Sequence, residues 1–580
     1  MSFLKCPILL HLLSAREVLM LKKFLTASLV FFTVAGFIFA SPRGKQELVN
    51  SDSWIYDALT ALSMESGKTC MADETPITIG EIESILLEVE REKLSAAGQA
   101  QYDRIVGYIA HGGLSFSMGL LSFSVDPELN LEGYYKSNDE LDWVYDRYFK
   151  QPIASAPLTF MAGDYFTMGM EVELSMNHCA FNRDDNYLNI PISSLGDFDI
   201  NFPHFAYGST GIMLNENTGV NLRAGLGTQS IGRALTGSIM MSEYFTDASY
   251  LNLEIFSPFF RYNMNVTEFN VDKYLYTHRF TVRFFKKLQF TVMESMLVNA
   301  PIELRFLNPL TIFHGTSAWE DYGGHETHVS DYLCLGINYV PVPYLRIYGQ
   351  FAMNQWQTIY ERTNWPNDTT PNSLAFQLGT ELFYPVSEGY LHAWIEGVYT
   401  DPYMYIKEGP NWSLVRTYCE NVGDMDPIYE WLGSSFGPDT IAGKLSAEYE
   451  VPGKWSVGAS YLFAACGEYS GSKVFTEALN WGGTNRYHED LDEWVYPNAD
   501  KPTQGFDEAK KRQSWLAPHG TPEFKNQITL SGGWAPTDYL SLSAQPSLVF
   551  VFNRNNIEGN FEIGWEFALS SKLIISRMFK

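Results

Sequence analysis

The sequence predicts a mostly β protein, a large antiparallel transmembrane β-barrel preceded by a small N-terminal helical domain. Three observations lead to this prediction. An apolar run near the N-terminus has the order of a secretory signal, apolar and polar residues alternate along many later segments, and short connections between those segments alternate with long ones. Aromatic residues make up 15% of the chain and charged residues only 18%, a balance that suits a barrel facing lipid.

The N-terminal segment is expected to direct export. Lys22-Lys23 precede the apolar run from Phe24 to Ala40, after which polarity returns. A charged segment followed by an apolar one is the pattern of a secretory signal peptide, and an uncleaved membrane anchor is the alternative. We expect translation to begin at Met20, so that residues 1–19 precede the true start and residues 20–40 form the signal peptide.

Residues 45–110 are predicted to form a small periplasmic helical bundle. Apolar residues recur at helical spacing from Trp54 to Leu62. Thr78 and Glu81 form a capping-box pattern that opens a second helix, and a third is expected from Gln101 to Ile109. A role as plug, dock or adaptor stays open at this point.

From about residue 115 to residue 580, apolar residues no longer recur at the helical period of 3.6 residues but at every second position. Between Tyr344 and Asn354, for example, Leu345 and Ile347 alternate with Arg346 and Tyr348, so that one face is apolar and the other polar. With strands of ~10 residues plus their connections, this region holds roughly 16 to 18 strands.

Connection lengths distinguish a membrane barrel from a soluble sandwich. The short connections are at residues 286–287, 340–343, 385–389, 452–454 and 536–538. The long ones are at residues 299–331, 355–372, 401–442 and 465–525. This alternation predicts short turns in the periplasm, long loops outside and an integral location in the bacterial outer membrane.

The C-terminal segment bears on whether the number of strands is even, as expected for a bacterial barrel. The apolar series that starts at Phe561 continues in phase through Leu573 to Phe579. We therefore expect one long closing strand, or a strand plus a tail, that ends in the periplasm.

Charge and motifs exclude several classes of function. The net charge of −27 argues against a nucleic-acid partner, because phosphates would be repelled. The segment His325-Glu326-Thr327-His328 falls one residue short of the metalloprotease pattern, because Val329 occupies the place of the second histidine ligand. The cysteines have no metal-site spacing. We expect no metal, no cofactor and no catalytic residue, so the protein is predicted not to be an enzyme.

Several segments resemble one known family. They are the run from Lys273 to Phe280, Glu294-Ser295, the run from Leu304 to Pro309, Ile231-Gly232-Arg233, and the run from Tyr399 to Tyr405. Their order and spacing are similar to those of the capsule assembly (Wzi-like) outer-membrane family. The chain departs from that pattern after Arg233, where the expected Trp-Gly pair is missing.

This resemblance implies a monomeric barrel of about 18 strands with a periplasmic helical bundle. It also implies a surface lectin that binds or anchors exported polysaccharide. The partners expected are polysaccharide or lipopolysaccharide at the cell surface, outer-membrane lipid and the barrel assembly machinery. A porin or solute channel and a surface adhesin are the alternatives.

Carbohydrate recognition needs aromatic platforms and polar groups at a surface that a polymer can reach. Ligand-binding residues are expected in the outer loops, and the alternative is that the same residues form membrane-interface girdles or loop cores. The candidates are Trp319, Trp356, Arg362, Trp365, Trp412, Trp431, Trp481 and Trp494.

A second group of residues is expected inside the barrel. Charged side chains of both signs in a lumen pair with one another and offset the cost of their burial. The predicted lumen network consists of Arg233, His278, Arg279, Glu294 and Arg346.

Overall fold

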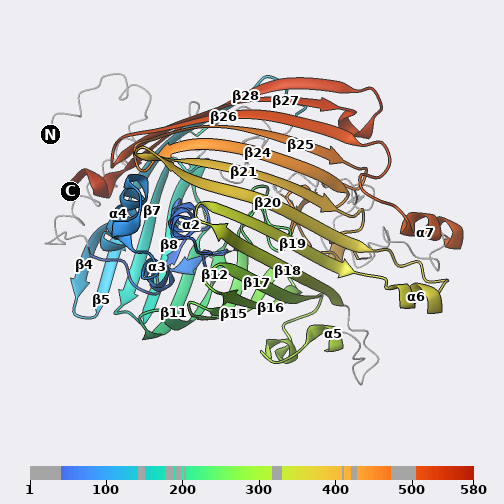
Figure 1. Ribbon diagram of the computed structural model, residues 1–580, viewed down its shortest axis with the longest axis horizontal. Coiled ribbons are helices and arrows are strands. Elements are labelled where there is room, and N and C mark those ends of the chain that lie inside the picture. The colour runs from blue at the N-terminus through green and yellow to red at the C-terminus, as the bar shows by residue number, and fades with distance from the viewer. Residues whose placement is uncertain are drawn as a thin grey trace.

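The computed structural model describes residues 41–141, 151–176, 187–189, 198–201, 204–316, 329–407, 410–419, 427–471, 474 and 505–579. These residues form a closed antiparallel barrel of 18 strands, and strand accounts for 53% of the structure (Figure 1). The predicted fold class and strand number are therefore confirmed. The expected signal peptide and start site lie outside the described residues.

Each strand of the barrel pairs with its neighbours in chain order, and β28 closes the barrel by pairing with β6 from Glu566–Lys136 to Ile574–Glu128. Between β6 and β7, the short strand β5 (Leu121–Val125) takes over part of the pairing with β7. The barrel strands are β6 (Glu128–Lys136), β7 (Ala154–Ala162), β8 (Phe166–Met176), β11 (Ala206–Asn215), β12 (Thr218–Gly227), β14 (Ala248–Phe256), β15 (Phe260–Asn270), β16 (Lys273–Phe284), β17 (Leu288–Val298), β18 (Val329–Val342), β19 (Leu345–Gln355), β20 (Ser373–Val386), β21 (Gly389–Thr400), β24 (Thr440–Val451), β25 (Trp455–Cys466), β26 (Glu523–Thr537), β27 (Leu540–Phe552) and β28 (Phe561–Ile574).

Short and long connections lie at opposite ends of the barrel, as predicted. The five short connections each join two barrel strands in a tight turn, and the four long ones join β17 to β18, β19 to β20, β21 to β24 and β25 to β26. The long connections carry α5 (Phe313–Thr316), α6 (Ile359–Asn364) and α7 (Gly505–Gln513), which lie away from the N-terminal helices and the C-terminal tail (Figure 1).

The C-terminal segment is a strand followed by a tail. Strand β28 ends at Ile574, and a short 3-10 helix follows from Ile575 to Phe579. The N–H of Ile575 donates to the carbonyl of Pro127, so the tail lies beside the start of β6. The prediction that the chain ends on the side of the short turns is confirmed.

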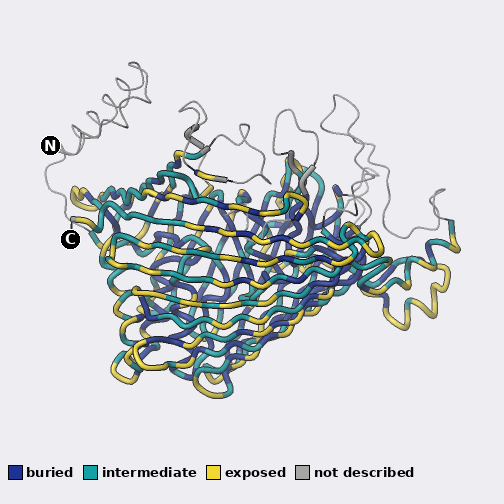
Figure 2. The backbone as a smooth tube through the Cα atoms, turned by 90° about the horizontal axis from the view of Figure 1, so that it is seen from above, coloured by how far each residue is buried: buried dark blue, intermediate teal, exposed yellow. Residues whose placement is uncertain are grey.

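The outer face of the barrel is apolar. Exposed and buried residues alternate along the strands (Figure 2), and the exposed positions are rich in large hydrophobic side chains such as Phe280, Phe290, Ile337, Leu378 and Trp565. A closed barrel with this outer surface is an integral outer-membrane protein, because closure pairs the strand backbones with one another and the outer side chains suit lipid. No helix in the described residues is long and apolar enough to span a membrane.

The N-terminal helices form as predicted. They are α2 (Ile55–Glu65), α3 (Ile79–Leu86) and α4 (Ala96–Ala110). Thr78 and Glu81 make the full capping box of α3, in which each side chain accepts from the other residue's backbone N–H. The three helices surround a buried apolar cluster that includes Ile55, Leu59 and Ile82.

The helical domain lies inside the mouth of the barrel (Figure 1). Its short strand β2 (Glu74–Thr75) pairs with β13 (Ser230–Ile231), which belongs to the connection between β12 and β14. The Tyr390 hydroxyl of the barrel wall bonds to Glu65 of α2, and Arg104 of α4 lies 3.3 Å from Glu450 of β24. The domain is therefore a plug that contacts the inner wall on several sides.

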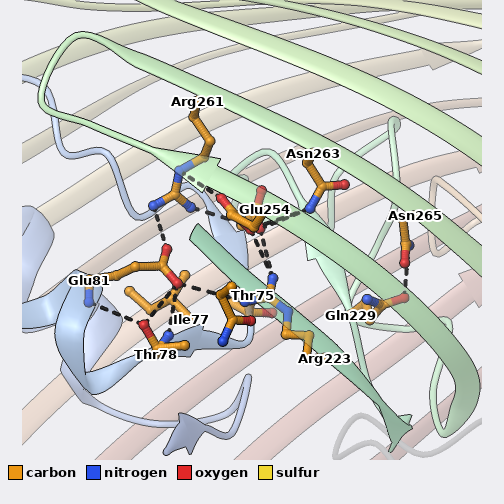
Figure 3. A network of polar contacts seen from close by, with 12 residues as sticks. Thr75, Ile77, Thr78, Glu81, Arg223, Gln229, Glu254, Arg261, Asn263 and Asn265 are labelled. Atoms are coloured by element: carbon orange, nitrogen blue, oxygen red, sulfur yellow. Dashed lines mark hydrogen bonds and ion pairs between the residues drawn. The ribbon is translucent and has the colours of Figure 1, made fainter. Parts of the chain in front are cut away.

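Buried ion pairs join this plug to the wall (Figure 3). Arg223 of β12 lies 3.0 Å from both Glu74 and Glu254, and Arg261 of β15 lies 2.6 Å from Glu81. These side chains are all almost completely buried. Removing one partner of such a pair is strongly destabilising, because the other charge stays buried without its counter-charge.

We therefore expect Glu74→Ala to release the plug. Arg223 and Arg279 would both lose a carboxylate partner, at a cost of ~3 kcal/mol or more. Hydrogen exchange and limited proteolysis of residues 41–113 would show faster opening of the plug in the variant.

Asp103→Ala is the matched control, because it breaks the Arg91–Asp103 pair on the exposed side of α4. Exposed pairs contribute ~1 kcal/mol or less, so this variant should open like the unmodified protein. Equal opening in the two variants would contradict the structural role given to the buried pairs.

Candidate functional site

The connection between β12 and β14 folds into the lumen. Ser238 donates a hydrogen bond of 2.8 Å to Gln350 of β19, and the Gln377 side-chain amide of β20 donates 2.9 Å to the carbonyl of Gly237. The backbone N–H of Thr236 donates to Glu396 of β21 at 2.9 Å. The wall strands thus hold this connection at three successive positions.

The described part of the β21–β24 connection folds inward as well. The backbone N–H of Tyr405 donates to the Asn354 side chain of β19, and Lys273 of β16 donates to the carbonyls of Pro410 and Val415. Together with the β12–β14 connection, it forms a large buried apolar cluster that includes Met240 and Tyr405. The two connections therefore fill the outer part of the lumen on the side of β14–β21.

Three residues of the predicted lumen network lie in the interior. Arg346 of β19 lies 2.7 Å from Glu381, and Arg233 lies 2.6 Å from the same carboxylate and also contacts Asp57 of α2. Arg279 lies 2.7 Å from Asp73 and also contacts the Glu74 carboxylate. Arg346 thus pairs two wall strands, Arg279 connects the wall to the helical plug, and Arg233 connects the β12–β14 connection to both.

His278 and Glu294 do not belong to this network, so that part of the prediction is wrong. They are cross-strand neighbours on β16 and β17, and both point to the outside of the barrel. The reason is the alternation of side chains along a strand, since His278 directly precedes the inward-facing Arg279.

Several members of the interior network were missed. They include Arg223, Glu254, Arg261, Glu381 and Glu396, all buried. The signal for some of them is visible in the sequence, because Asn252 and Glu254 occupy alternate positions of one strand, as do Arg261, Asn263 and Asn265 of the next.

The side of the lumen next to β24–β28 is less tightly filled. On β27, Ser541 and Ser543 face inward and are exposed, whereas Ser547, Val549 and Val551 further along are buried. A cavity of about 150 Å³ lies beside the exposed serines and is lined mainly by serine, glycine and alanine. We call this region the polar vestibule, and further along β27 Val549 and Val551 pack against Leu141.

Trp431, a predicted ligand-binding residue, is part of the core. Its side chain is only 5% exposed, and its indole N–H donates to the carbonyl of Gly471 at 2.9 Å. The expectation of a ligand contact there is wrong, because the connection that carries Trp431 folds into the barrel. Trp412 lies half-buried in the same connection, in a short 3-10 helix (Pro410–Trp412).

Three predicted ligand-binding residues of the β19–β20 connection lie at the surface. Trp356, Arg362 and Trp365 are exposed, with Trp365 56% exposed. Tyr360 is exposed beside them, and its ring meets that of Trp365 edge-on with 6.0 Å between the centroids. We call these four side chains the α6 surface. Trp319, Trp481 and Trp494 lie outside the described residues.

The α6 surface rests on a firm local structure. Thr358 and Glu361 form a capping box at the start of α6, and the N–H of Trp365 donates to the carbonyl of Glu361 at 2.8 Å. The Gln513 side chain of α7 donates to the carbonyls of Asp368 and Thr370, which fixes the remainder of the connection. Tyr360 and Arg362 thus lie on this helix, Trp365 caps its end and Trp356 precedes it, and the helix lies beyond the strands (Figure 1).

A buried carboxylate ties together the neighbouring outer segments. Asp439, just before β24, accepts hydrogen bonds from the backbone N–H groups of Tyr469 at 3.0 Å and His519 at 2.7 Å. Burial raises the pKa of the Asp439 carboxyl to about 7. The His519 ring stacks on Trp515, so this carboxylate holds the backbone of a residue that belongs to an aromatic pair of the outer segments.

We expect the outer segments to be more stable at pH 5 than at pH 8. A carboxyl with a pKa higher in the folded than in the unfolded chain binds its proton more tightly when folded, so stability falls as the pH rises through that range. Melting temperatures at the two pH values would measure the difference, and Asp439→Asn should reduce it. Asp538→Asn, in an exposed turn, should retain it, and an unchanged difference in Asp439→Asn would contradict the assignment.

Comparisons with known proteins agree with this architecture. No model of a protein family and no curated protein matches the chain. Among solved structures, the chain is similar to Wzi of Escherichia coli, described as an outer-membrane protein involved in group 1 capsule assembly and a carbohydrate-binding β-barrel. The two share 13% sequence identity over 91% of this chain and 99% of that chain, with a TM-score of 0.53.

Two further solved structures are similar to the chain with lower scores. DcaP of Acinetobacter baumannii has 9% identity over 79% of this chain and 99% of its own, and OprD of Pseudomonas aeruginosa has 8% identity over 78% and 95%. Both have TM-scores of 0.33. The similarity to Wzi confirms the resemblance at the level of the fold, and the chain is an integral outer-membrane β-barrel.

Proposed function

We propose that the protein binds polysaccharide at the cell surface through the α6 surface and acts without catalysis. The observation that carries this proposal is an exposed aromatic group on and beside a capped helix, at the outer end of a barrel whose lumen is filled on the side of β14–β21. The fold it shares with a barrel described as carbohydrate-binding is consistent with this role.

The chemistry of the α6 surface suits a carbohydrate. Trp356, Tyr360 and Trp365 offer large rigid rings against which the apolar faces of sugars can pack, and exposed aromatic groups of this kind mark interaction sites. Arg362 on the same helix supplies hydrogen-bond donors for sugar hydroxyls or carboxylates. Because the capped helix already fixes the backbone, little conformational freedom is lost on binding.

We expect Trp365→Ala to weaken binding of the host strain's purified surface polysaccharide at least about tenfold, which corresponds to about 1.4 kcal/mol. Tyr360→Ala should weaken it in the same direction. Folding should be unaffected, because both rings are exposed. Binding of the purified barrel to immobilised polysaccharide would measure the effect.

Phe285→Ala is the matched control, since Phe285 is a 91% exposed aromatic residue in a turn at the opposite end of the barrel. This variant should bind as the unmodified protein does. Full binding by Trp365→Ala and Tyr360→Ala, or no binding by the unmodified barrel, would exclude the proposed role.

A solute channel is the second candidate, favoured by the polar vestibule along β24–β28. The packing of Leu141 against Val549 and Val551 opposes it, because these apolar side chains occupy part of the lumen at the outer end of β27. We expect no steady ion conductance when the purified barrel is inserted into planar bilayers. Steady pores would favour the channel and count against a filled lumen.

A further inference from the structure

One long connection lies against the outside of the barrel wall. Residues 299–316, which we call the outer flap, follow β17 and include a short 3-10 helix (Leu304–Leu307) and α5. Tyr276 of β16 and Met296 of β17 are cross-strand neighbours that point outward, yet both are almost fully buried. Phe306 and Phe313 of the flap cover them and are themselves fully buried.

The same strands are uncovered further from the outer rim. Phe280 of β16 and Phe290 of β17 also point outward, and both are exposed. The flap therefore takes the place of lipid over the outer part of the wall only.

Polar contacts anchor the flap to outward-facing residues. The N–H of Glu303 donates to the Tyr276 hydroxyl at 3.1 Å, and the Tyr262 hydroxyl donates to the carbonyl of Pro309 at 3.2 Å. The N–H of His314 donates to the Glu294 carboxylate at 3.0 Å, and the His278 ring lies 4.5 Å from that of Phe313. The flap thus shields His278 and Glu294, two polar residues on a face that would otherwise meet lipid.

The outer side of the flap is strongly apolar. Four large aliphatic side chains project from it, with Leu310 88% and Leu304 81% exposed and Ile302 and Ile312 also exposed. The nearby charges of Glu303 and Arg305 pair with each other at 2.5 Å. A flap that carries so much exposed apolar surface needs an apolar neighbour.

We propose that the outer flap inserts into the outer leaflet of the membrane and that lipid acyl chains cover Leu304 and Leu310. The flap is continuous with the lipid-facing wall, because it lies directly on the outer faces of β15, β16 and β17, above the exposed Phe280 and Phe290. The side chains of the flap thereby extend the apolar belt of the barrel on this one side. The flap forms a membrane contact separate from the α6 surface.

Photo-crosslinking in proteoliposomes tests this assignment. Leu310→p-benzoylphenylalanine places the photoreactive group on the flap, and Leu304→p-benzoylphenylalanine provides a second position in case one variant folds poorly. Phe290→p-benzoylphenylalanine on the wall is the lipid-exposed control. Ile359→p-benzoylphenylalanine on α6 is the control for an aqueous position, because Ile359 is 86% exposed on a helix beyond the strands.

Each variant would be reconstituted in phosphatidylcholine vesicles that contain lipopolysaccharide. We expect lipid adducts at residues 310 and 304 within about twofold of the yield at residue 290, and well above the yield at residue 359. A lipid yield at both flap positions as low as that at residue 359 would overturn the proposal. Crosslinks between two copies of the chain at both flap positions would also overturn it, and would identify the flap as a self-association surface instead.

Discussion

The structure depends on the pairing of buried arginines with carboxylates inside the barrel. Strands β12, β15 and β16 point Arg223, Arg261 and Arg279 inward, where an unpaired charge costs several kcal/mol. The helical plug supplies counter-charges through Glu74 and Glu81, at 3.0 Å from Arg223 and 2.6 Å from Arg261. Because each pair joins the wall to an inserted segment, the plug cannot leave without exposing uncompensated charge in the interior.

The same constraint acts further along the lumen. Glu381 of β20 pairs with Arg346 of the neighbouring strand and with Arg233 of the β12–β14 connection, and Arg233 also reaches Asp57 of α2. One carboxylate therefore links the wall, an inserted connection and the plug. Above this point the filling becomes apolar, since Met240 and Tyr405 belong to one buried cluster. Because the ion pairs and the apolar cluster fill the lumen on this side, an external ligand can reach only the outer surface there.

Local patterns in the sequence predict the elements well. The capping box of Thr78 and Glu81, the alternation along β19 and the connection lengths depend on neighbouring residues, so they are visible without knowledge of the fold. The direction in which a long connection folds is not local. Trp431 and Trp365 both lie in long connections, yet one is buried and the other exposed, because only the first finds partners on the inner wall.

Three of the long connections thus reach different environments, and their apolar content alone does not predict which environment each one reaches. The β21–β24 connection enters the lumen, where Asn354 and Lys273 bind its backbone, while the outer flap lies on the wall, where Tyr276 and Glu294 bind its backbone. The β19–β20 connection is held instead by its own capping box and by α7, which belongs to the β25–β26 connection. Its aromatic side chains therefore remain at the surface on a rigid support, which is the arrangement that recognition of an external ligand requires.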